Sequence, residues 1–345
     1  MTNHRLIVTG LLSLPITLFS FLWFNNDIHS DKFVSEPTYQ LAFANFGPLN
    51  DEIFIADEDG NNAKPLVPGP GNESNASFSP DGKWVVFTSN RNGPYDIYIV
   101  HPDGSGLERL THDDAFDDQA SFSPDAKKIA FVSSRNGQAD IYIFDLATRK
   151  TVNITNHAGG DFRPCWSPDG KWIAFSSDRD SKNPRPIFGI WHSTEIFTMR
   201  SDGSDVVKRT FIDAVAGSPC WSPDGKQLLF YQATLYQVRK MNFVERTPST
   251  TQLSTVTLSD NLQRPLTKDT GEKIYPRWFA DGSIAYTTWQ DNGAIKFLNS
   301  NKSVKGVFNN PSWSPDGKKI VYDREVGNAW PEAVASACCI WCSNR

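Results

Sequence analysis

Residues 78–88 read Phe-Ser-Pro-Asp-Gly-Lys-Trp-Val-Val-Phe-Thr, a four-residue turn motif followed at once by an apolar strand. Proline fixes φ at the first turn position, aspartate hydrogen-bonds local backbone, and glycine tolerates positive φ. Because apolar residues also precede the motif, the stretch predicts a β-hairpin. Turn formation is sufficient to explain the motif, so a structural role is favoured for it.

The turn motif recurs along the chain. Its further copies are Ser123-Pro124-Asp125-Ala126, Ser167-Pro168-Asp169-Gly170, Ser222-Pro223-Asp224-Gly225, Phe279-Ala280-Asp281-Gly282 and Ser314-Pro315-Asp316-Gly317. A third strand follows most copies, as in Asp96–Val100 and Asp140–Phe144, and a fourth closes the unit near Leu110 or Ile154. Four antiparallel strands in a unit of about 44 residues are typical of a β-propeller blade.

The sequence therefore predicts an all-β fold, a β-propeller of six four-stranded blades whose ring is closed by pairing of N- and C-terminal strands. The first blade region supplies only strands two to four, predicted at Gln40–Ala44, Glu52–Ala56 and Ala63–Val67. The last copy, Pro311–Tyr322, can supply the missing inner strand. Since that copy also brings a second strand, a seventh partial blade stays open.

The repeats resemble those of a known family. The order Phe/Trp-Ser-Pro-Asp-Gly-Lys, Ile-Ala-Phe-x-Ser-x-Arg, Asp-Ile-Tyr, Leu-Thr is similar to the WD-like, PD-type repeats of TolB-like propellers, which are related to dipeptidyl peptidase propeller domains. The resemblance spans roughly residues 39–324. It implies the fold and no single activity, because similar blades occur in TolB, in dipeptidyl peptidases and in oligogalacturonate lyase. Without a Gly-x-Ser-x-Gly elbow or residues left for a hydrolase domain, peptidase activity is not expected.

The N-terminal region differs in composition from the repeats. Arg5 is the only full side-chain charge before Leu6–Phe24, an uncharged apolar run just long enough to span a bilayer. Three regions are expected: a signal peptide or signal anchor with a short linker (1–30), the propeller (38–324) and an irregular C-terminal tail (325–345). Arg5 before the run and acids after it place the propeller across the membrane. We expect an exported protein, periplasmic or extracellular, which residues 6–24 anchor to the membrane if the signal is uncleaved.

Charge and cysteine content restrict the partners. A formal net charge of −5 gives no basic field for nucleic-acid backbones, so nucleic acid is not expected as a partner. Cys165 and Cys220 occupy the same place in adjacent repeats, where a small buried strand residue is favoured and a bridge between them is the other option. The remaining cysteines, Cys338, Cys339 and Cys342, form one cluster without histidines, to which no metal is assigned.

Acidic residues cluster where the blade-to-blade connections are expected. In a four-stranded blade these connections open on the same face as the loops between strands two and three, where function is most expected. The acids predicted at this channel rim are Glu73, Asp113, Asp114, Asp117, Asp118 and Asp161. Carboxylates on a confined rim would attract a cation or a basic peptide segment. The alternative is that they cap turns and face solvent.

Histidines and arginines recur near the same rim. His112 and His157 follow the fourth strands of consecutive blades and, with Asp161, form the alternative of a divalent-metal set. Mere repeat similarity and solvation explain the two histidines equally simply. Three arginines follow strand two, and local ion pairing with the acids of strand three explains them; the arginines are Arg91, Arg135 and Arg179, and the acids are Asp96, Asp140 and Glu195.

Two loops on this face exceed the repeat length. The first, Asp180–Ser193, carries Trp191, and the second, Ala233–Gln252, carries Tyr236 and Arg239. Exposed aromatic side chains beside arginine suit partner anchoring. Packing of these loops on each other or on the blade edge is the alternative.

The predicted function is that of an exported, monomeric, TolB-like propeller that binds a protein or peptide at the channel mouth. No catalytic residue and no cofactor are assigned, so the chain is expected not to be an enzyme. The alternative is a metal-dependent carbohydrate-active enzyme, as the resemblance to oligogalacturonate lyase implies, or another small-molecule-binding propeller. A divalent metal stays open under that alternative.

Overall fold

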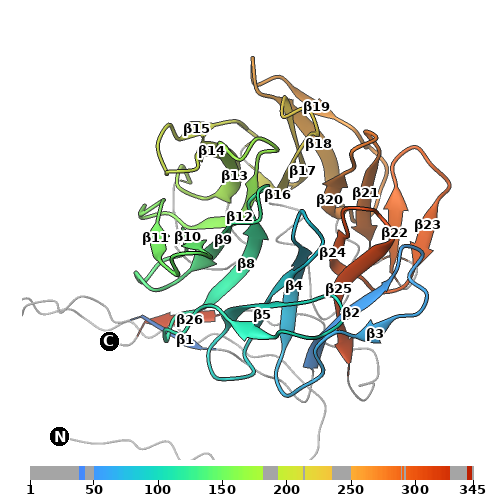
Figure 1. Cartoon of the computed structure of the whole chain (residues 1–345). Helices are drawn as coiled ribbons and strands as arrows, with labels where there is room; N and C mark the ends of the chain where they lie inside the picture. Colours follow the sequence, from blue (N-terminus) through green and yellow to red (C-terminus); the bar gives the residue numbers. More distant parts are fainter. Residues whose placement is uncertain are drawn as a thin grey trace, which may run out of the picture. The chain divides into compact units, whose positions relative to one another are not determined.

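The computed structural model describes residues 39–42, 50–181, 193–212, 214–234, 250–288, 290, 293–326 and 340–343. These residues form β-strands joined by turns and loops, and no α-helix occurs among them (Figure 1). None of the described segments is a helix with the length and apolarity needed to cross a bilayer. The apolar run at residues 6–24 lies outside the described residues.

Six four-stranded sheets surround a common centre, with the first strand of each sheet innermost (Figure 1). This confirms the predicted six-bladed propeller. Blade 1 comprises β4 (Glu73–Phe78), β5 (Val85–Ser89), β6 (Asp96–Val100) and β7 (Glu108–Arg109). Blade 2 comprises β8 (Asp117–Phe122), β9 (Lys128–Ser133), β10 (Asp140–Asp145) and β11 (Thr151–Asn153). Blade 3 comprises β12 (Asp161–Trp166), β13 (Trp172–Ser177), β14 (Glu195–Arg200) and β15 (Val207–Lys208).

The next two blades are also continuous in sequence. Blade 4 comprises β16 (Val215–Trp221), β17 (Gln227–Ala233), β18 (Gln252–Thr257) and β19 (Gln263–Pro265). Blade 5 comprises β20 (Ile274–Trp278), β21 (Ile284–Thr288), β22 (Ala294–Phe297) and β23 (Ser303–Lys305). Each sheet is antiparallel, so the turn between strands one and two opens on one face and the loop between strands two and three on the other.

Blade 6 closes the ring from both ends of the described chain. It comprises β24 (Asn309–Trp313), β25 (Lys319–Val326), β2 (Asn50–Asp57) and β3 (Lys64–Pro65). Strands β2 and β25 pair from Asn50↔Val326 to Asp57↔Lys319, and the Lys319 ammonium lies 2.6 Å from an Asp57 carboxylate oxygen. The predicted closure by terminal strands is confirmed.

The last repeat contributes two strands to this blade, not only the inner one. Because β25 pairs with both β24 and β2, it fills the second-strand place that was expected for Gln40–Ala44. That expectation is wrong: β1 (Tyr39–Ala42) pairs instead with β26 (Ile340–Ser343). The blade is complete with four strands, so the last copy does not begin a seventh blade.

The repeated turns have the local chemistry that the sequence predicts. Ser79 Oγ donates to Asp81 Oδ1 at 2.6 Å and accepts the Trp84 N–H at 2.9 Å. The same pair of hydrogen bonds forms at Ser123, Ser167, Ser222 and Ser314. Gly82 has φ of 70°, where glycine is free of strain. The motif therefore makes turns.

The core lies between neighbouring sheets. Val85 and Phe87 pack toward blade 6, whereas the intervening Val86 packs toward blade 2. Both faces of a blade are therefore apolar, which explains continuous apolar strands in place of simple alternation. This stacking holds the connections and the strand two–three loops on one face, which we call the loop face; its described residues include 90–95, 111–116, 134–139, 155–160, 178–181, 193–194 and 210–212.

Candidate functional site

Three of the predicted acids lie inside the loop face, each bound by an arginine of its own blade. The Arg91 guanidinium lies 2.9 Å from Glu73 Oε1. The equivalent pairs are Arg135 with Asp117 at 2.9 Å and Arg179 with both oxygens of Asp161 at 2.8 Å. The three carboxyl side chains are 0% exposed. They therefore hold the strand two–three loop to the inner strand and do not present charge to solvent.

These acid–arginine pairs correct the partners expected from the sequence. The arginines were expected to pair with acids of strand three, but they pair with the first residue of the inner strand. Each guanidinium also lies over aromatic rings of the blade, as Arg179 does at 5.0 Å from the Phe175 ring and 5.1 Å from the Phe197 ring. Of the strand-three acids, Asp96 pairs with a different arginine, Arg109, at 2.6 Å.

Burial dominates the protonation of these carboxyl groups. It raises the pKa of Asp117 to about 6, against the lowering effect of the Arg135 charge. Burial also raises the pKa of Glu73 and of Asp161 above the ordinary range, although Arg91 and Arg179 oppose it. A carboxyl group in a low-dielectric interior keeps its proton to higher pH unless the ion pair offsets the lost hydration.

The other predicted rim acids differ in exposure. Asp113 is partly exposed and shares Arg135 with Asp117, at 2.9 Å from the guanidinium. Asp114 is exposed. Asp118 is buried against blade 1, where its Oδ1 accepts hydrogen bonds from Thr88 Oγ1 at 2.8 Å and Asn75 Nδ2 at 2.6 Å. The structure thus brings Asp113 and Asp117 together, and directs Asp118 elsewhere.

Every inner strand contains a β-bulge directly before its last two residues. The residue in the bulge has positive φ in all six blades; these residues are Asn75 (55°), Gln119 (57°), Arg163 (52°), Ser218 (49°), Tyr275 (49°) and Asn310 (45°). A bulge of this kind bends the strand and re-aims a side chain, and such bulges are common beside functional sites. Here it produces a ring of polar side chains around the channel.

Arg163 crosses this ring. Its Nη1 donates to Asn310 Oδ1 of blade 6 at 2.9 Å, and its guanidinium lies 5.0 Å from the Tyr275 ring of blade 5. The backbone N–H of Arg163 donates to Gln119 Oε1 at 2.8 Å. One side chain of blade 3 therefore ties together three other blades across the channel.

A second carboxyl group, that of Asp323 in blade 6, is buried against blade 1. Asp323 Oδ1 accepts the Asn75 N–H at 3.1 Å. Burial raises the pKa of Asp323 to about 8, with a further rise from the Asp51 charge. Burial likewise raises the pKa of Asp51 to about 6. Asp323 is therefore mainly protonated at neutral pH.

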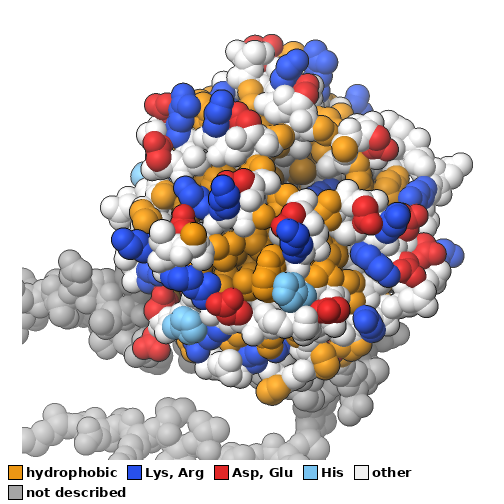
Figure 2. All heavy atoms as spheres, in the orientation of Figure 1, with side chains coloured by type: hydrophobic (Ala, Val, Ile, Leu, Met, Phe, Trp, Pro, Cys, Tyr) orange, Lys and Arg blue, Asp and Glu red, His pale blue; other side chains and the backbone are white. Residues whose placement is uncertain are grey.

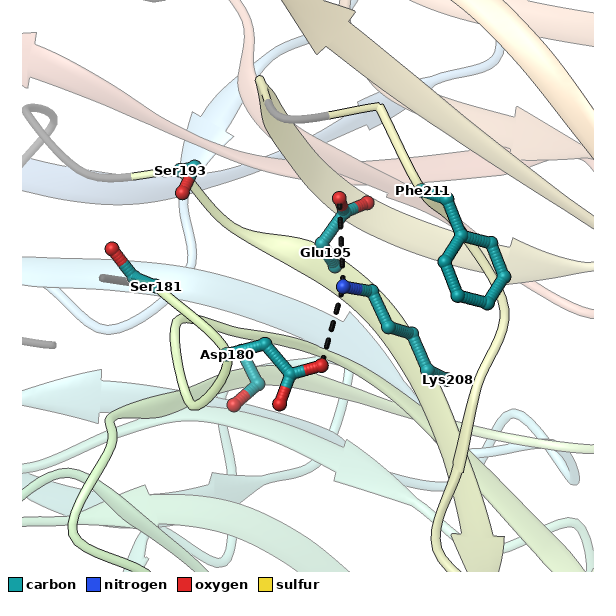
Figure 3. Close-up of a pocket in the computed structure, with 7 residues that line it drawn as sticks. Asp180, Ser181, Ser193, Glu195, Lys208 and Phe211 are labelled. Carbon is teal, nitrogen blue, oxygen red and sulfur yellow. Dashed lines mark ion pairs between the residues drawn. The ribbon is translucent and has the colours of Figure 1, made fainter. Parts of the chain in front are cut away.

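A small cavity of about 230 Å³ opens on the loop face of blade 3. Figure 3 shows the Lys208 ammonium between two carboxylates, 3.2 Å from Asp180 and 3.8 Å from Glu195. The Phe211 ring lies beside the same lysine, with the ammonium 5.2 Å from the ring centre. Phe211 is 65% exposed, the highest value among the large apolar side chains described as exposed. Ser181 and Ser193 line the opposite side (Figure 3).

Comparison with known proteins agrees with the repeat architecture. The model of the TolB β-propeller domain (PD40) matches residues 118–265, and the model of the Tricorn protease N-terminal β-propeller domain matches residues 40–138. The repeats over residues 118–265 are of the TolB-like propeller type. No curated protein sequence matches it.

Solved structures share the fold of this TolB-like propeller at low sequence identity. TolB from Acinetobacter baumannii is 21% identical with a TM-score of 0.57, over 80% of this chain and 64% of that one. A chain of a nidogen/laminin complex is 10% identical with a TM-score of 0.55, over 79% and 98%. Hydrazine synthase from Kuenenia stuttgartiensis is 15% identical with a TM-score of 0.56, over 81% and 47%. The chain thus spans less than two thirds of the TolB structure.

The residues of the metal alternative do not converge in the described part of this TolB-like propeller. His112 and His157 are exposed, His157 Nδ1 accepts the Gly159 N–H at 3.0 Å, and Asp161 is bound to Arg179. Among the described residues, no three His, Cys, Asp or Glu side chains are grouped so that they could hold a metal ion. The predicted loop residues Trp191, Tyr236 and Arg239 lie outside the described residues.

Sequence reasoning missed the channel ring and the Lys208 cavity of the TolB-like propeller. One signal could have found the ring: the residue three places before the aromatic residue that ends each inner strand is polar in every copy. A second signal could have found the ion pairs, since each acid and its arginine are 18 residues apart. No local pattern points to the contact of Arg163 with Asn310, which are 147 residues apart.

Proposed function

We propose that this TolB-like propeller is a non-catalytic module that binds a protein or peptide segment on its loop face. The observation that carries the proposal is Phe211, which is 65% exposed beside the Lys208 cavity. An aromatic side chain with neighbouring charges has the composition of an interface hot spot. Asp180, Glu195 and Lys208 would then orient the polar groups of the bound segment.

The rim acids have two different parts in this proposal. Asp113 and Asp114, which are accessible, would meet basic groups of the partner. The buried acids Glu73, Asp117 and Asp161 would act indirectly, because each holds its loop through an arginine. A loop that is already ordered loses less conformational entropy when a partner binds. Asp118 would keep the channel wall in place beneath the rim.

The inserted loops extend the proposed surface. Trp191 follows Ser181 along the chain, and Tyr236 and Arg239 follow the end of β17. Both insertions connect strands two and three, so they leave from the loop face. Their aromatic and arginine side chains would add contacts to the partner. On the face displayed in Figure 2, side chains of both charges surround apolar ones. Such a mixture fits a protein partner better than a polyanionic partner such as nucleic acid.

The fold is compatible with this role without selecting it. One similar structure is a chain of a nidogen/laminin complex, and another is hydrazine synthase. Since one fold hosts several functions, the support for binding comes from the surface around Phe211 and not from the fold.

A peptide-library selection on the purified full chain tests the proposal. We expect enriched peptides to bind Phe211→Ala at least tenfold more weakly, since an aromatic hot spot contributes about 2 kcal/mol or more. The matched control is Val152→Ser, which alters another exposed apolar side chain on the outer strand of blade 2, 58% exposed. Peptides that bind Phe211→Ala as tightly as the unaltered chain would contradict the proposal, as would a selection without enrichment.

The rim is tested by the double change Asp113→Asn and Asp114→Asn. These residues are accessible, so the fold is expected to be retained, whereas alanine at Asp161 would leave Arg179, whose side chain is only 10% exposed, without its carboxylate partner. Basic peptides should bind the double variant more weakly, with the difference shrinking as salt is added. Unchanged affinity at low salt would remove the rim from the binding surface.

We also propose that the propeller is exported. The support is the uncharged run Leu6–Phe24 after Arg5. Residues 1–38 fused to a reporter that is active only outside the cytosol should give activity, and two arginines placed within the run should abolish it. Reporter activity that survives this change would contradict export by this segment.

A further inference from the structure

Two cysteines occupy equivalent positions in neighbouring inner strands. Cys165 of β12 and Cys220 of β16 each follow the bulge directly and pair across the sheet with Ala174 and Leu229. Both are free thiols and partly buried. The Trp221 indole Nε1 donates to the Cys165 carbonyl at 3.0 Å, so the two strands are closely packed at this level.

The same position in blades 6 and 1 shows how close these side chains come. There the residues are serines, and Ser312 Oγ lies 3.5 Å from Ser77 Oγ. The Phe78 N–H of the next strand donates to Ser312 Oγ at 3.3 Å. In blades 4 and 5 the equivalent donor is the Trp278 N–H, at 3.4 Å from Cys220 Sγ. Side chains at this position thus lean onto the following blade, and in blades 6 and 1 the two equivalent side chains meet.

Cys165 leans onto blade 4 in the same way. Its sulfur accepts the Trp221 N–H and interacts directly with the Cys220 thiol. The pKa of Cys220 is lowered to about 6, first by the hydrogen bond from Cys165, and also by the nearby Arg277 charge and the Trp278 N–H, against the rise that burial causes. The pKa of Cys165 is raised by the same pairing. One thiol therefore donates while the other carries thiolate character, which makes it a nucleophile.

We propose that Cys165 and Cys220 are a redox pair that closes a disulfide between blades 3 and 4 on exposure to a small-molecule disulfide. In the first step the Cys220 thiolate attacks one sulfur of the oxidant, which forms a mixed disulfide and releases one small thiolate. In the second step Cys165 loses its proton to solvent and attacks the Cys220 sulfur, which expels the second thiolate. The protein gives up two electrons and two protons, and the oxidant becomes two thiols.

The closed bridge would tie two inner strands at the channel wall. It would join residues 55 positions apart, and cross-linking of a long loop stabilises a fold by restricting the unfolded chain. The inference is independent of partner binding. An oxidising compartment, as export would provide, favours the closed form.

Mass spectrometry of the full chain tests the pair. After treatment with oxidised glutathione, a tryptic digest without reduction should contain residues 151–171 linked to residues 210–226, with a mass two hydrogens below their sum. The Tm should rise and return to its starting value when dithiothreitol is added. In Cys165→Ser, Cys220 should instead retain glutathione as a mixed disulfide.

Two results would overturn the proposal. One is that both thiols still react with an alkylating agent after oxidation. The other is that Cys165 or Cys220 is linked to a cysteine of the C-terminal cluster, Cys338, Cys339 or Cys342. Because the linked peptides are sought in the unaltered chain, a variant that fails to fold does not affect the test.

Discussion

Blades 1–3 and blades 4–6 share the same hairpins but differ at the loop face. In blades 1–3 the inner strand begins with an acid that an arginine of the strand two–three loop binds. The corresponding residues of blades 4–6 are Ala216, Lys273 and Phe308. All three are buried, so the position is interior in every blade whatever its chemistry.

This difference distinguishes the interactions that form a blade from those that fix the loops at its rim. Interblade packing occurs around the whole ring, including the sheets without an acid–arginine pair. The pair is therefore unnecessary for forming a blade, and its effect is to fix one loop locally. Blade 5 uses another solution, in which the Lys273 ammonium donates to the carbonyls of Asp269 and Gly271, both at 3.2 Å.

The largest expected effect comes from breaking one pair in blade 3. Asp161→Ala should lower the free energy of unfolding by about 3–5 kcal/mol, because Arg179 would keep a buried and uncompensated charge. The matched change in blade 5 is Asp269→Ala, which removes a carboxylate that is 70% exposed beside Lys273. It should cost less than about 1 kcal/mol. Denaturant unfolding measures both; equal losses would show that the two halves do not differ in this way.

The pH dependence of stability sharpens the comparison at the channel. Blades 1, 3 and 5 place a hydroxyl where blade 6 places Asp323; these residues are Thr88, Ser176 and Thr287. The folded chain holds the Asp323 proton up to about pH 8, while the unfolded chain loses it near the ordinary carboxyl pKa. The folded state thus binds more protons in between, so the free energy of unfolding should fall as pH rises through that window.

Asp323→Asn removes this titration and keeps an oxygen for the Asn75 N–H. Unfolding midpoints measured from pH 6 to pH 8 should therefore fall less steeply in the variant. The upper part of the window is diagnostic, since the pKa of Asp117 and of Asp51 is about 6. Identical slopes in both proteins would mean that Asp323 is ionised in the fold at neutral pH.

The same contrast explains how far the sequence could be read. Turn chemistry and strand pattern are local, so they predicted six blades and closure by the chain ends. The partner of Arg179 was misplaced because Glu195 appears nearer in the repeat pattern, while the real partner, Asp161, lies across the hairpin. Arg163 and Asn310 meet only after the ring has closed, and Lys208 and Phe211 form a cavity only with strand three beside them. Such contacts depend on assembly and not on any repeat.

The smallest expected effect concerns the turns, where blade 5 again departs from the pattern. In blade 3 the buried Ser167 hydroxyl donates to Asp169 and accepts the Trp172 N–H, so Ser167→Ala should cost about 1 kcal/mol. In blade 5 the first turn residue has no hydroxyl, and the exposed Ser283 supplies one that donates to Asp281.

Ser283→Ala should therefore change the free energy of unfolding by no more than about 0.5 kcal/mol, as is usual for exposed side chains. Denaturant titrations of the two variants measure the difference. A loss at Ser283 as large as that at Ser167 would show that the hydroxyl stabilises the turn wherever it lies. In that case blade 5 would be equivalent to the other blades at this turn. Blades 4–6 would then differ from blades 1–3 only on the loop face.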